Sequence, residues 1–256
     1  MDETTPEPQT RSADGAQPDP HEVQRITEAL AAVRERIDAA ARAVDRDAEQ
    51  IRLLPVSKTV PEDRLRAAVA AGCAELGENK VQEAAGKASA MADLGVRWSI
   101  IGHLQRNKAK DVAAFADEFQ ALDSLRLAEA LDRRLQGEGR GLDVMVQVNT
   151  SGEDSKFGMP PEEVPQFLEQ LPQFASLRVT GLMTIAMASE DEDRVRACFR
   201  RLRVLRDRAQ QDGPGFAGDG ELSMGMSEDL ELGVAEGSTC VRVGRSIFGS
   251  RPAPRG

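Results

Sequence analysis

Hydrophobic residues along the chain follow two alternating patterns. Short apolar runs rich in β-branched residues occur at 51–57, 73–77, 97–101, 118–122, 142–149, 178–185, 221–224 and 239–243. Runs of this length predict buried strands. The segments between them are longer and amphipathic; in 123–139, for example, leucine and alanine recur at helical spacing. The pattern therefore predicts strands that alternate with helices through most of the chain.

A further helix is predicted before the first strand. Residues 21–47 carry apolar side chains at helical spacing, from Val23 and Ile26 through Leu30, Val33 and Ile37 to Val44. Residues 1–20 are rich in proline, acidic residues, threonine and glycine, which predicts a disordered acidic tail. Residues 251–256 are predicted to form a flexible C-terminus, which leaves 21–250 as one domain.

The order of these elements predicts an α/β fold. Eight strand–helix units in roughly 200 residues, with no surplus for a second domain, favour a single closed (β/α)8 TIM barrel with an extra N-terminal helix. An open, doubly wound sheet is the structural alternative. In a barrel of this kind, ligands bind at the carboxyl ends of the strands.

Composition excludes several classes of function. The chain of 256 residues has 43 acidic and 33 basic residues, a formal net charge of −10, and no dense Lys/Arg run, which argues against nucleic-acid binding. Its three cysteines lie far apart, which fits a reducing compartment better than a disulfide framework. The two histidines, His21 and His103, do not make a metal site. No apolar stretch is long enough to span a bilayer, so a soluble, cytoplasmic protein is expected.

Polar residues gather where the predicted strands end. They include Lys58 after the first strand and the segments 77–79, 102–108, 149–158, 223–227 and 244–246. Because the carboxyl ends of parallel strands meet on one rim of a barrel, these residues are expected to form one site.

Lys58 ends an apolar run in the sequence IRLLPVSKTVPED. A lysine at this place either extends its ammonium group to water or to an ion pair, or serves as an amine of lowered pKa that forms an imine with a carbonyl compound. The next helix is predicted to begin near Pro61, with Thr59 as its candidate N-cap.

Residues 222–250 contain two strand-to-turn junctions rich in glycine and serine. Backbone N–H groups at such junctions form an anion site, and the loops after the seventh and eighth strands commonly bind phosphate in this fold. The alternative is that they are merely tight loops. An amine and a phosphate cradle on the same rim together suggest a phosphorylated aldehyde as the ligand.

Three other polar residues have two interpretations each. Arg242 lies between valines in the last strand and must be paired, either by an acidic neighbour such as Glu228 or Asp229 or by a ring nitrogen of a ligand. Asn79 either caps the next helix or contacts a ligand. His103 is expected to stack or to form a hydrogen bond.

Seven segments carry a family resemblance: PVSKT, GENKVQE, IGHLQRNK, VQVNTSGEDSKFG, GLMTIA, SMGMSEDLELGVAEGSTCVRVG and IFG. In this order, and over residues 23–250, they resemble the pyridoxal phosphate homeostasis protein family of the YggS/PROSC type. The resemblance implies a barrel similar to the N-terminal domain of alanine racemase, a fold-type III barrel, with pyridoxal 5′-phosphate (PLP) bound as an aldimine on Lys58.

The resemblance also implies roles for further residues. The phosphate would contact Ser227, Gly244 and Arg245, and its pocket would be shaped by Ser223, Met224 and Gly225. Arg242 would face the pyridine nitrogen, and Asn79 and His103 would line the ring. An arginine at the pyridine nitrogen disfavours ring protonation and so weakens the electron sink that carbanion chemistry needs.

The chain departs from the family pattern at two positions. Many members have a second lysine where Val60 stands, and many have a small or hydroxyl residue where Arg245 stands. The first departure removes an auxiliary amine. The second leaves the backbone N–H for phosphate and adds a guanidinium that is able to make a charge-assisted contact.

Racemases that share this resemblance use a tyrosine as the acid/base on the face of the cofactor opposite the lysine. This chain contains no tyrosine. The resemblance therefore implies a non-catalytic, monomeric PLP-binding protein that acts in intracellular PLP homeostasis and delivers the cofactor to apo-enzymes. The alternatives are a PLP-dependent amino-acid racemase or lyase of low activity, and a barrel aldolase in which Lys58 attacks a sugar phosphate.

Overall fold

The computed structural model of the chain describes residues 17–153 and 155–249. Most of the predicted tail and all of the segment 251–256 lie outside these residues. The predicted N-terminal helix is confirmed as α1, Pro20–Arg42, and Asp19 at its N-cap accepts a hydrogen bond from the backbone N–H of His21 at 2.9 Å. Its apolar stripe is buried through residues such as Ile26, Val33 and Ile37.

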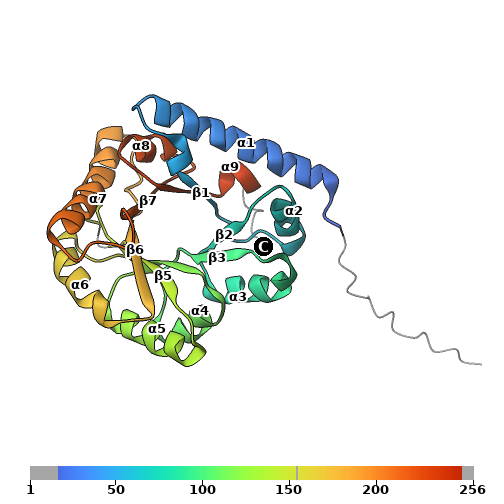
Figure 1. Cartoon of the computed structure of the whole chain (residues 1–256). Helices are drawn as coiled ribbons and strands as arrows, with labels where there is room; N and C mark the ends of the chain where they lie inside the picture. The colour runs from blue at the N-terminus through green and yellow to red at the C-terminus, as the bar shows by residue number, and fades with distance from the viewer. Residues whose placement is uncertain (1–16, 154, 250–256) are drawn as a thin grey trace, which may run out of the picture.

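Eight strands form one parallel sheet, as the apolar runs predicted (Figure 1). They are β1 Arg52–Pro55, β2 Glu75–Glu78, β3 Arg97–Ile100, β4 Glu118–Leu122, β5 Leu142–Gln147, β6 Leu177–Met183, β7 Glu221–Met226 and β8 Cys240–Val243. Each strand lies within, or within one or two residues of, its predicted range.

The sheet curls into a nearly closed barrel. Its order is β1-β8-β7-β6-β5-β4-β3-β2, so that β1 and β8 pair directly. Between β1 and β2 the ladder is reduced to a bridge between Val56 and Gly77 and a 2.9 Å hydrogen bond from Ser57 N to the Gly77 carbonyl. The open, doubly wound alternative is therefore wrong.

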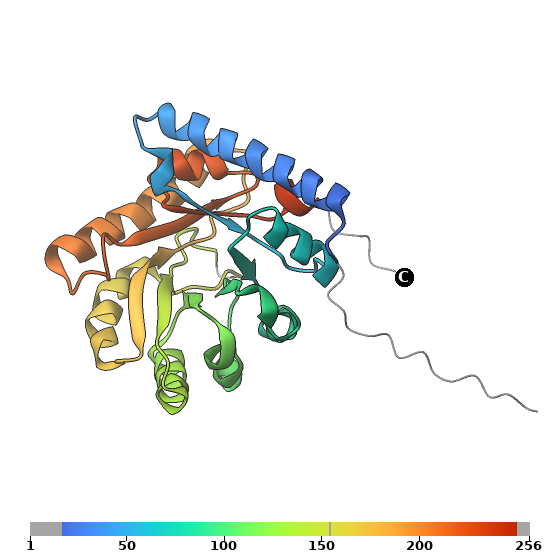
Figure 2. The same ribbon diagram turned by 45° about the vertical axis from the view of Figure 1, so that its right-hand side comes forward.

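Helices surround the barrel in the order of the chain (Figures 1 and 2). They are α2 Glu62–Ala70, α3 Val81–Ala90, α4 Ala109–Phe115, α5 Leu125–Glu138, α6 Val164–Gln170, α7 Glu192–Asp212, α8 Leu230–Ala235 and α9 Arg245–Phe248. Short 3₁₀ turns lie at Ala48–Gln50, Ala92–Leu94, Arg106–Lys108, Pro161–Glu163 and Leu171–Gln173.

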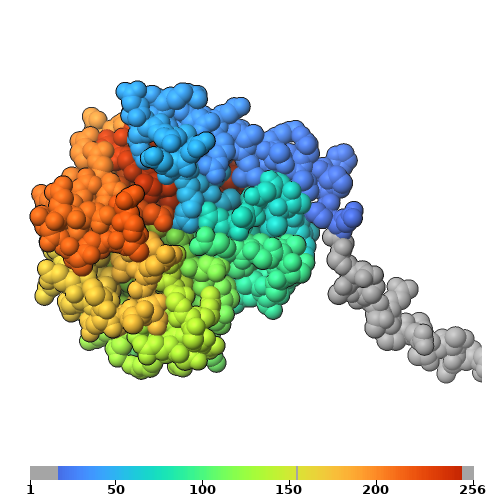
Figure 3. Space-filling model, in the orientation of Figure 1, coloured from blue at the N-terminus to red at the C-terminus, as the bar shows by residue number. Residues whose placement is uncertain are grey.

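Helix α1 covers the side of the barrel that the four-residue α9 is too short to cover. It lies along α8, α9 and α2, and the space-filling view shows it across that side of the molecule (Figure 3). Arg25 of α1 donates to the Ile247 carbonyl at 3.1 Å, and Arg64 of α2 donates to the Phe248 carbonyl at 2.8 Å. The extra helix thus completes the outer layer and holds the end of the barrel in place.

The three cysteines are free and buried. Within the described part of the chain, none of the helices is long and apolar enough to cross a membrane.

Candidate functional site

The predicted site residues lie on one rim of the barrel because the strands are parallel. Lys58 follows β1, Asn79 follows β2, His103 follows β3, Ser227 follows β7, and Gly244 and Arg245 follow β8. The rim therefore brings together the ends of strands that are as much as 190 residues apart in sequence.

Lys58 is half-buried in a tight turn at the end of β1. The backbone N–H of Val60 donates to the Ser57 carbonyl at 3.0 Å, and Thr59 between them has a positive φ of 64°. Helix α2 begins only at Glu62, with Pro61 at its N-cap. The prediction that Thr59 caps this helix is therefore wrong, because its backbone is used to turn the chain.

A charged cluster lies beside this turn. Lys87 of α3 contacts Glu83 at 2.7 Å, Glu78 at 2.6 Å and the Ser57 carbonyl at 2.9 Å. Burial raises the pKa of Glu78, and hydrogen bonds from Lys87 and Ser57 only partly offset it. Burial also acts to raise the pKa of Glu83, but hydrogen bonds from Lys87 and Thr59 N–H outweigh it and lower the pKa overall.

Arg242 is 3% exposed and points into the barrel. Its guanidinium donates to Ser223 Oγ at 2.6 Å and to the Thr184 carbonyl at 2.8 Å, and burial lowers its pKa. Among the described residues, neither Glu228 nor Asp229 forms an ion pair with it, so the prediction of an acidic partner from that loop is wrong. The guanidinium has five donors, and these two bonds leave others for a ligand.

A column of buried polar groups continues from Arg242 through the barrel. Ser223 Oγ donates to Gln120 at 2.6 Å, Gln120 donates to Glu118 at 2.7 Å, and Glu118 pairs with Arg52 at 2.7 Å. Arg52 lies at the opposite, amino end of the strands. The position of Arg242 is therefore fixed by groups that span the whole barrel.

The two Gly/Ser junctions are tightly packed against their neighbours. Gly225 has a φ of +92°, and a Cβ on the adjacent Gly233 would lie 2.9 Å from the Gly225 Cα. A Cβ on Gly244 would lie 3.0 Å from the Val56 carbonyl. The N-cap side chains of α8 and α9 make no hydrogen bond to the first-turn N–H groups. In α9 the N–H groups of Ile247 and Phe248 donate to the Gly244 carbonyl, so an anion there would bind to the N–H groups at the very start of the helix.

The side chains at these junctions differ in burial and in their contacts. Ser227 is half-buried, and its carbonyl accepts from Arg36 of α1 at 3.1 Å. Arg245 is exposed and pairs with Glu228, so its guanidinium joins the two junctions. Met224 is fully buried within a hydrophobic cluster, which places its side chain in the core.

The loops after β2 and β3 touch on the rim. A Cβ on Gly102 would lie only 2.1 Å from the Asn79 carbonyl, which places Asn79 and His103 close together. Lys80 rather than Asn79 occupies the N-cap of α3, so the capping interpretation of Asn79 is wrong. The residue is exposed.

His103 makes both kinds of contact that were expected. Its Nδ1 lies 3.2 Å from Asp123 Oδ2, and its ring stacks on Phe157 at a centroid distance of 4.1 Å and an angle of 7°. Phe157 belongs to the loop after β5, where Lys156 contacts Glu153 at 2.6 Å. That loop therefore reaches the rim.

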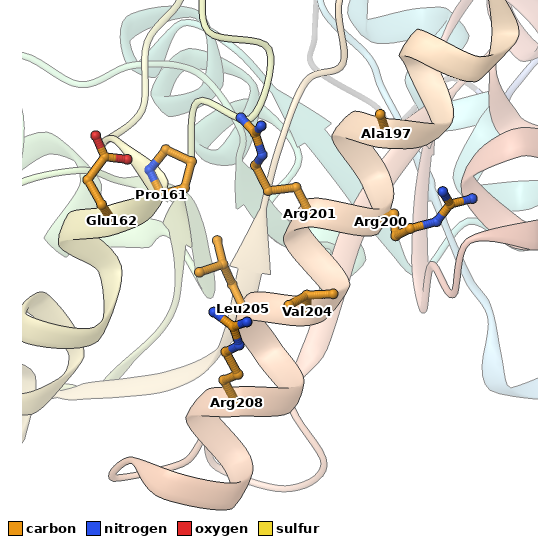
Figure 4. A pocket seen from close by; sticks show the side chains of 8 residues that line it. All are labelled: Pro161, Glu162, Ala197, Arg200, Arg201, Val204, Leu205 and Arg208. Carbon is orange, nitrogen blue, oxygen red and sulfur yellow. The ribbon is translucent and has the colours of Figure 1, made fainter.

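Two cavities lie away from these residues. One, of about 570 Å³, is on the outside of the barrel between α7 and the turn at Pro161, where Arg200, Arg201 and Arg208 surround Val204 (Figure 4). The other, of about 390 Å³, lies near Arg52 at the amino ends of the strands. No group of three or more metal-ligating side chains occurs within residues 17–153 and 155–249.

Sequence reasoning missed the residues that support the rim from behind. The i,i+4 spacing of Glu83 and Lys87 in GENKVQEAAGK is a signal for a helical ion pair, but it does not show that the pair reaches the turn of Lys58. Arg36 stands on the polar side of α1, and nothing in its sequence context indicates a contact 191 residues away.

Comparisons with known proteins identify the family of the chain. The family model for the alanine racemase N-terminal domain matches residues 29–252. The pyridoxal phosphate homeostasis protein of Pseudomonas aeruginosa is 41% identical over 226 residues, covering 88% of this chain and 96% of the relative. The Escherichia coli protein of the same name is 38% identical over 229 residues, covering 88% and 97%.

Solved structures extend the comparison. PipY of Synechococcus elongatus, with PLP bound, has a TM-score of 0.76 and 36% identity and covers 88% of this chain and 100% of its own. Alanine racemase of Corynebacterium glutamicum shares the fold, with a TM-score of 0.65 at 14% identity over 91% of this chain and 64% of its own. On these matches, the chain belongs to the pyridoxal phosphate homeostasis protein family, within the larger family defined by the alanine racemase N-terminal domain.

Proposed function

We propose that this protein binds PLP on the described rim and acts in intracellular PLP homeostasis. The observation that carries the proposal is the position of Lys58 on the same rim as the two Gly/Ser junctions after β7 and β8. Relatives named for PLP homeostasis, and PipY with PLP bound, support it. The Lys58 amine would hold PLP covalently, by condensing with its aldehyde with release of water.

The residues present fit the phosphate group. First-turn N–H groups of α8 and α9 are not taken by side-chain caps, and partial positive charge at helix starts favours an anion. Gly225 adopts a positive φ of 92° that favours glycine, and a Cβ on Gly244 would press on the Val56 carbonyl at 3.0 Å, so both junctions depend on glycine. The phosphate would accordingly bind between Ser227 and Arg245.

Arg242 fits the other end of the cofactor. A fixed guanidinium is a donor that cannot give up its proton, so facing a pyridine nitrogen it keeps that nitrogen unprotonated. PLP supplies an electrophilic aldehyde and an electron-withdrawing ring, and an unprotonated ring is the weaker electron sink. This arrangement supports binding over carbanion chemistry. Met224 is proposed to contribute through its backbone only, since its side chain is in the core.

Three further features belong to the same proposal: a cytoplasmic location, a monomeric state and delivery of PLP to apo-enzymes. They follow from the family and stay predictions for this chain. The racemase and aldolase barrels that share its fold do so at 14–20% identity, which carries the fold alone.

The test is to add PLP to the purified protein, record its absorbance spectrum, reduce it with borohydride and map the pyridoxyl peptide by mass spectrometry. We expect the adduct on Lys58 and its loss in Lys58→Ala, with weaker phosphate-dependent binding retained. Lys156→Ala is the matched control, because this lysine lies in a loop that reaches the rim but is paired with Glu153. An adduct absent from Lys58 in a folded wild-type protein would overturn the proposal.

A further inference from the structure

The turn that carries Lys58 has an unfavourable residue at its third position. Its ends, Ser57 and Val60, are joined by a 3.0 Å backbone hydrogen bond, and Lys58 and Thr59 are the central residues. The positive φ of 64° at Thr59 is that of a type II turn, in which glycine or asparagine normally occupies this position. A β-branched residue there is a conformational outlier, so other groups must hold it.

Helix α3 supplies those groups. The backbone N–H of Thr59 donates to Glu83 Oε1 at 2.6 Å, and Lys87 Nζ donates to the Ser57 carbonyl at 2.9 Å. Glu83 and Lys87 are themselves paired at 2.7 Å. One ion pair of α3 therefore binds the backbone immediately before and immediately after Lys58.

This ion pair is anchored in the protein interior. Lys87 is 10% exposed and lies 2.6 Å from Glu78, whose side chain is fully buried and also accepts from Ser57 Oγ at 2.6 Å. Glu83 retains 27% exposure. Because desolvated charges require their partners, losing one member of this cluster costs more than losing one member of a surface ion pair.

We propose that Glu83 and Lys87 form a clamp that imposes the type II turn and thereby positions the amine of Lys58. Both are positioning residues, since their contacts are with the backbone of the turn. Without the clamp, the peptide between Lys58 and Thr59 rotates, Thr59 returns to negative φ, and the side chain of Lys58 changes direction. The functional consequence rests on the proposed role of Lys58, whereas the conformational part does not.

The clamp predicts a specific rescue by Thr59→Gly. Glycine accepts positive φ without strain, so the turn keeps its shape when the clamp is removed. Glu83→Ala is expected to lower the equilibrium constant for the reducible PLP adduct at least tenfold. Adding Thr59→Gly is expected to restore it to within about threefold of Thr59→Gly alone. Glu83→Gln, which keeps an acceptor for the Thr59 N–H, is expected to lose less than Glu83→Ala.

Stability provides the readout that separates positioning from a general structural effect. Thr59→Gly does not replace the hydrogen bond and ion pair lost with Glu83, so the urea midpoint of the double variant is expected to be no higher than that of Glu83→Ala. Asp93→Ala is the matched control: this carboxylate pairs with Arg66 and does not touch the turn. Its adduct formation is expected to equal wild type. If adduct formation follows the urea midpoint in all variants, or if Thr59→Gly gives no rescue, the clamp is overturned.

A PLP-independent measurement distinguishes failure of the clamp from failure of the proposed function. The rate at which acetic anhydride acylates Lys58 in the cofactor-free chain, mapped by mass spectrometry, is expected to change in Glu83→Ala and to return towards wild type in the double variant. If wild type forms no PLP adduct on Lys58, the proposed function fails, and this acylation pattern still decides on the clamp. Equal acylation rates in all variants would overturn the clamp alone.

Discussion

Ser223 lies at the centre of the buried polar column, and its removal has a calculable cost. Its hydroxyl accepts from Arg242 at 2.6 Å and donates to Gln120 at 2.6 Å, and the residue is fully buried. Ser223→Ala removes one hydrogen bond from Arg242 and the one to Gln120 Oε1, while the bonds of Arg242 to the Thr184 carbonyl and of Gln120 to Glu118 remain. An unpaired buried neutral group costs about 1–3 kcal/mol and a charged one more, so we expect a loss of about 3–5 kcal/mol in the free energy of unfolding.

Equilibrium unfolding of the cofactor-free protein in urea measures this cost. Thr180→Val is the matched control, because Thr180 is also buried in the barrel but donates a single long bond of 3.3 Å to the Val144 carbonyl. We expect it to cost about 1 kcal/mol or less. For a domain of this size the Ser223→Ala loss corresponds to roughly 6–20 °C in Tm. A loss for Ser223→Ala no larger than that for Thr180→Val would refute the assignment of a mutually dependent polar column.

Two other contacts give separate predictions. Arg36→Ala removes the 3.1 Å hydrogen bond from α1 to the Ser227 carbonyl. We expect PLP affinity, measured by titration, to fall about three- to tenfold, because the junction after β7, proposed to bind the phosphate, loses a bond to a charged donor. Unchanged affinity would contradict the role of α1. Glu22 accepts hydrogen bonds from Arg25 and Arg64, which lower its pKa to about 2. The ionised carboxylate therefore contributes to the free energy of unfolding above its ordinary pKa of 4.5, and this contribution is lost as the pH falls towards 2. We therefore expect Glu22→Gln to be about 0.5–1 kcal/mol less stable than wild type at pH 7, a value limited by solvent screening, and equally stable near pH 2; a difference that does not depend on pH would contradict this.

The strands were predictable from the sequence because their physical basis is local. Buried parallel strands are continuous apolar runs, and 118–122 and 142–149 are recognisable without knowledge of their partners. The polar ends of the strands then follow from topology, since parallel strands bring their carboxyl ends to the same rim. Lys58 and Arg245 could thus be placed on one side of the barrel before any coordinates were known.

The errors concern side chains whose partners are distant in sequence or are backbone groups. Threonine is a residue type preferred at helix N-caps, but the backbone N–H of Thr59 is bound by Glu83, which lies 24 residues away. For Arg242 the sequence left an acidic neighbour and a ligand ring nitrogen as alternatives, and it did not indicate the serine hydroxyl and the carbonyl oxygen that hold the guanidinium. Glu118 begins an apolar run and gives no sign that it continues a polar column inside the barrel. Such contacts depend on the closed barrel as a whole, so no local pattern reports them.

The two halves of the proposed site therefore differ in what holds them. Arg242 donates directly to two neutral groups deep in the barrel, Ser223 Oγ and the Thr184 carbonyl. Lys58 is fixed by a charged pair on α3, one member of which, Glu83, remains partly exposed. Screening by salt and protonation of carboxylates act directly on such a pair, whereas the two direct contacts of Arg242 are with neutral groups. We therefore expect changes in salt or pH to alter the proposed covalent step at Lys58 before they alter the proposed contact of Arg242 with the ring.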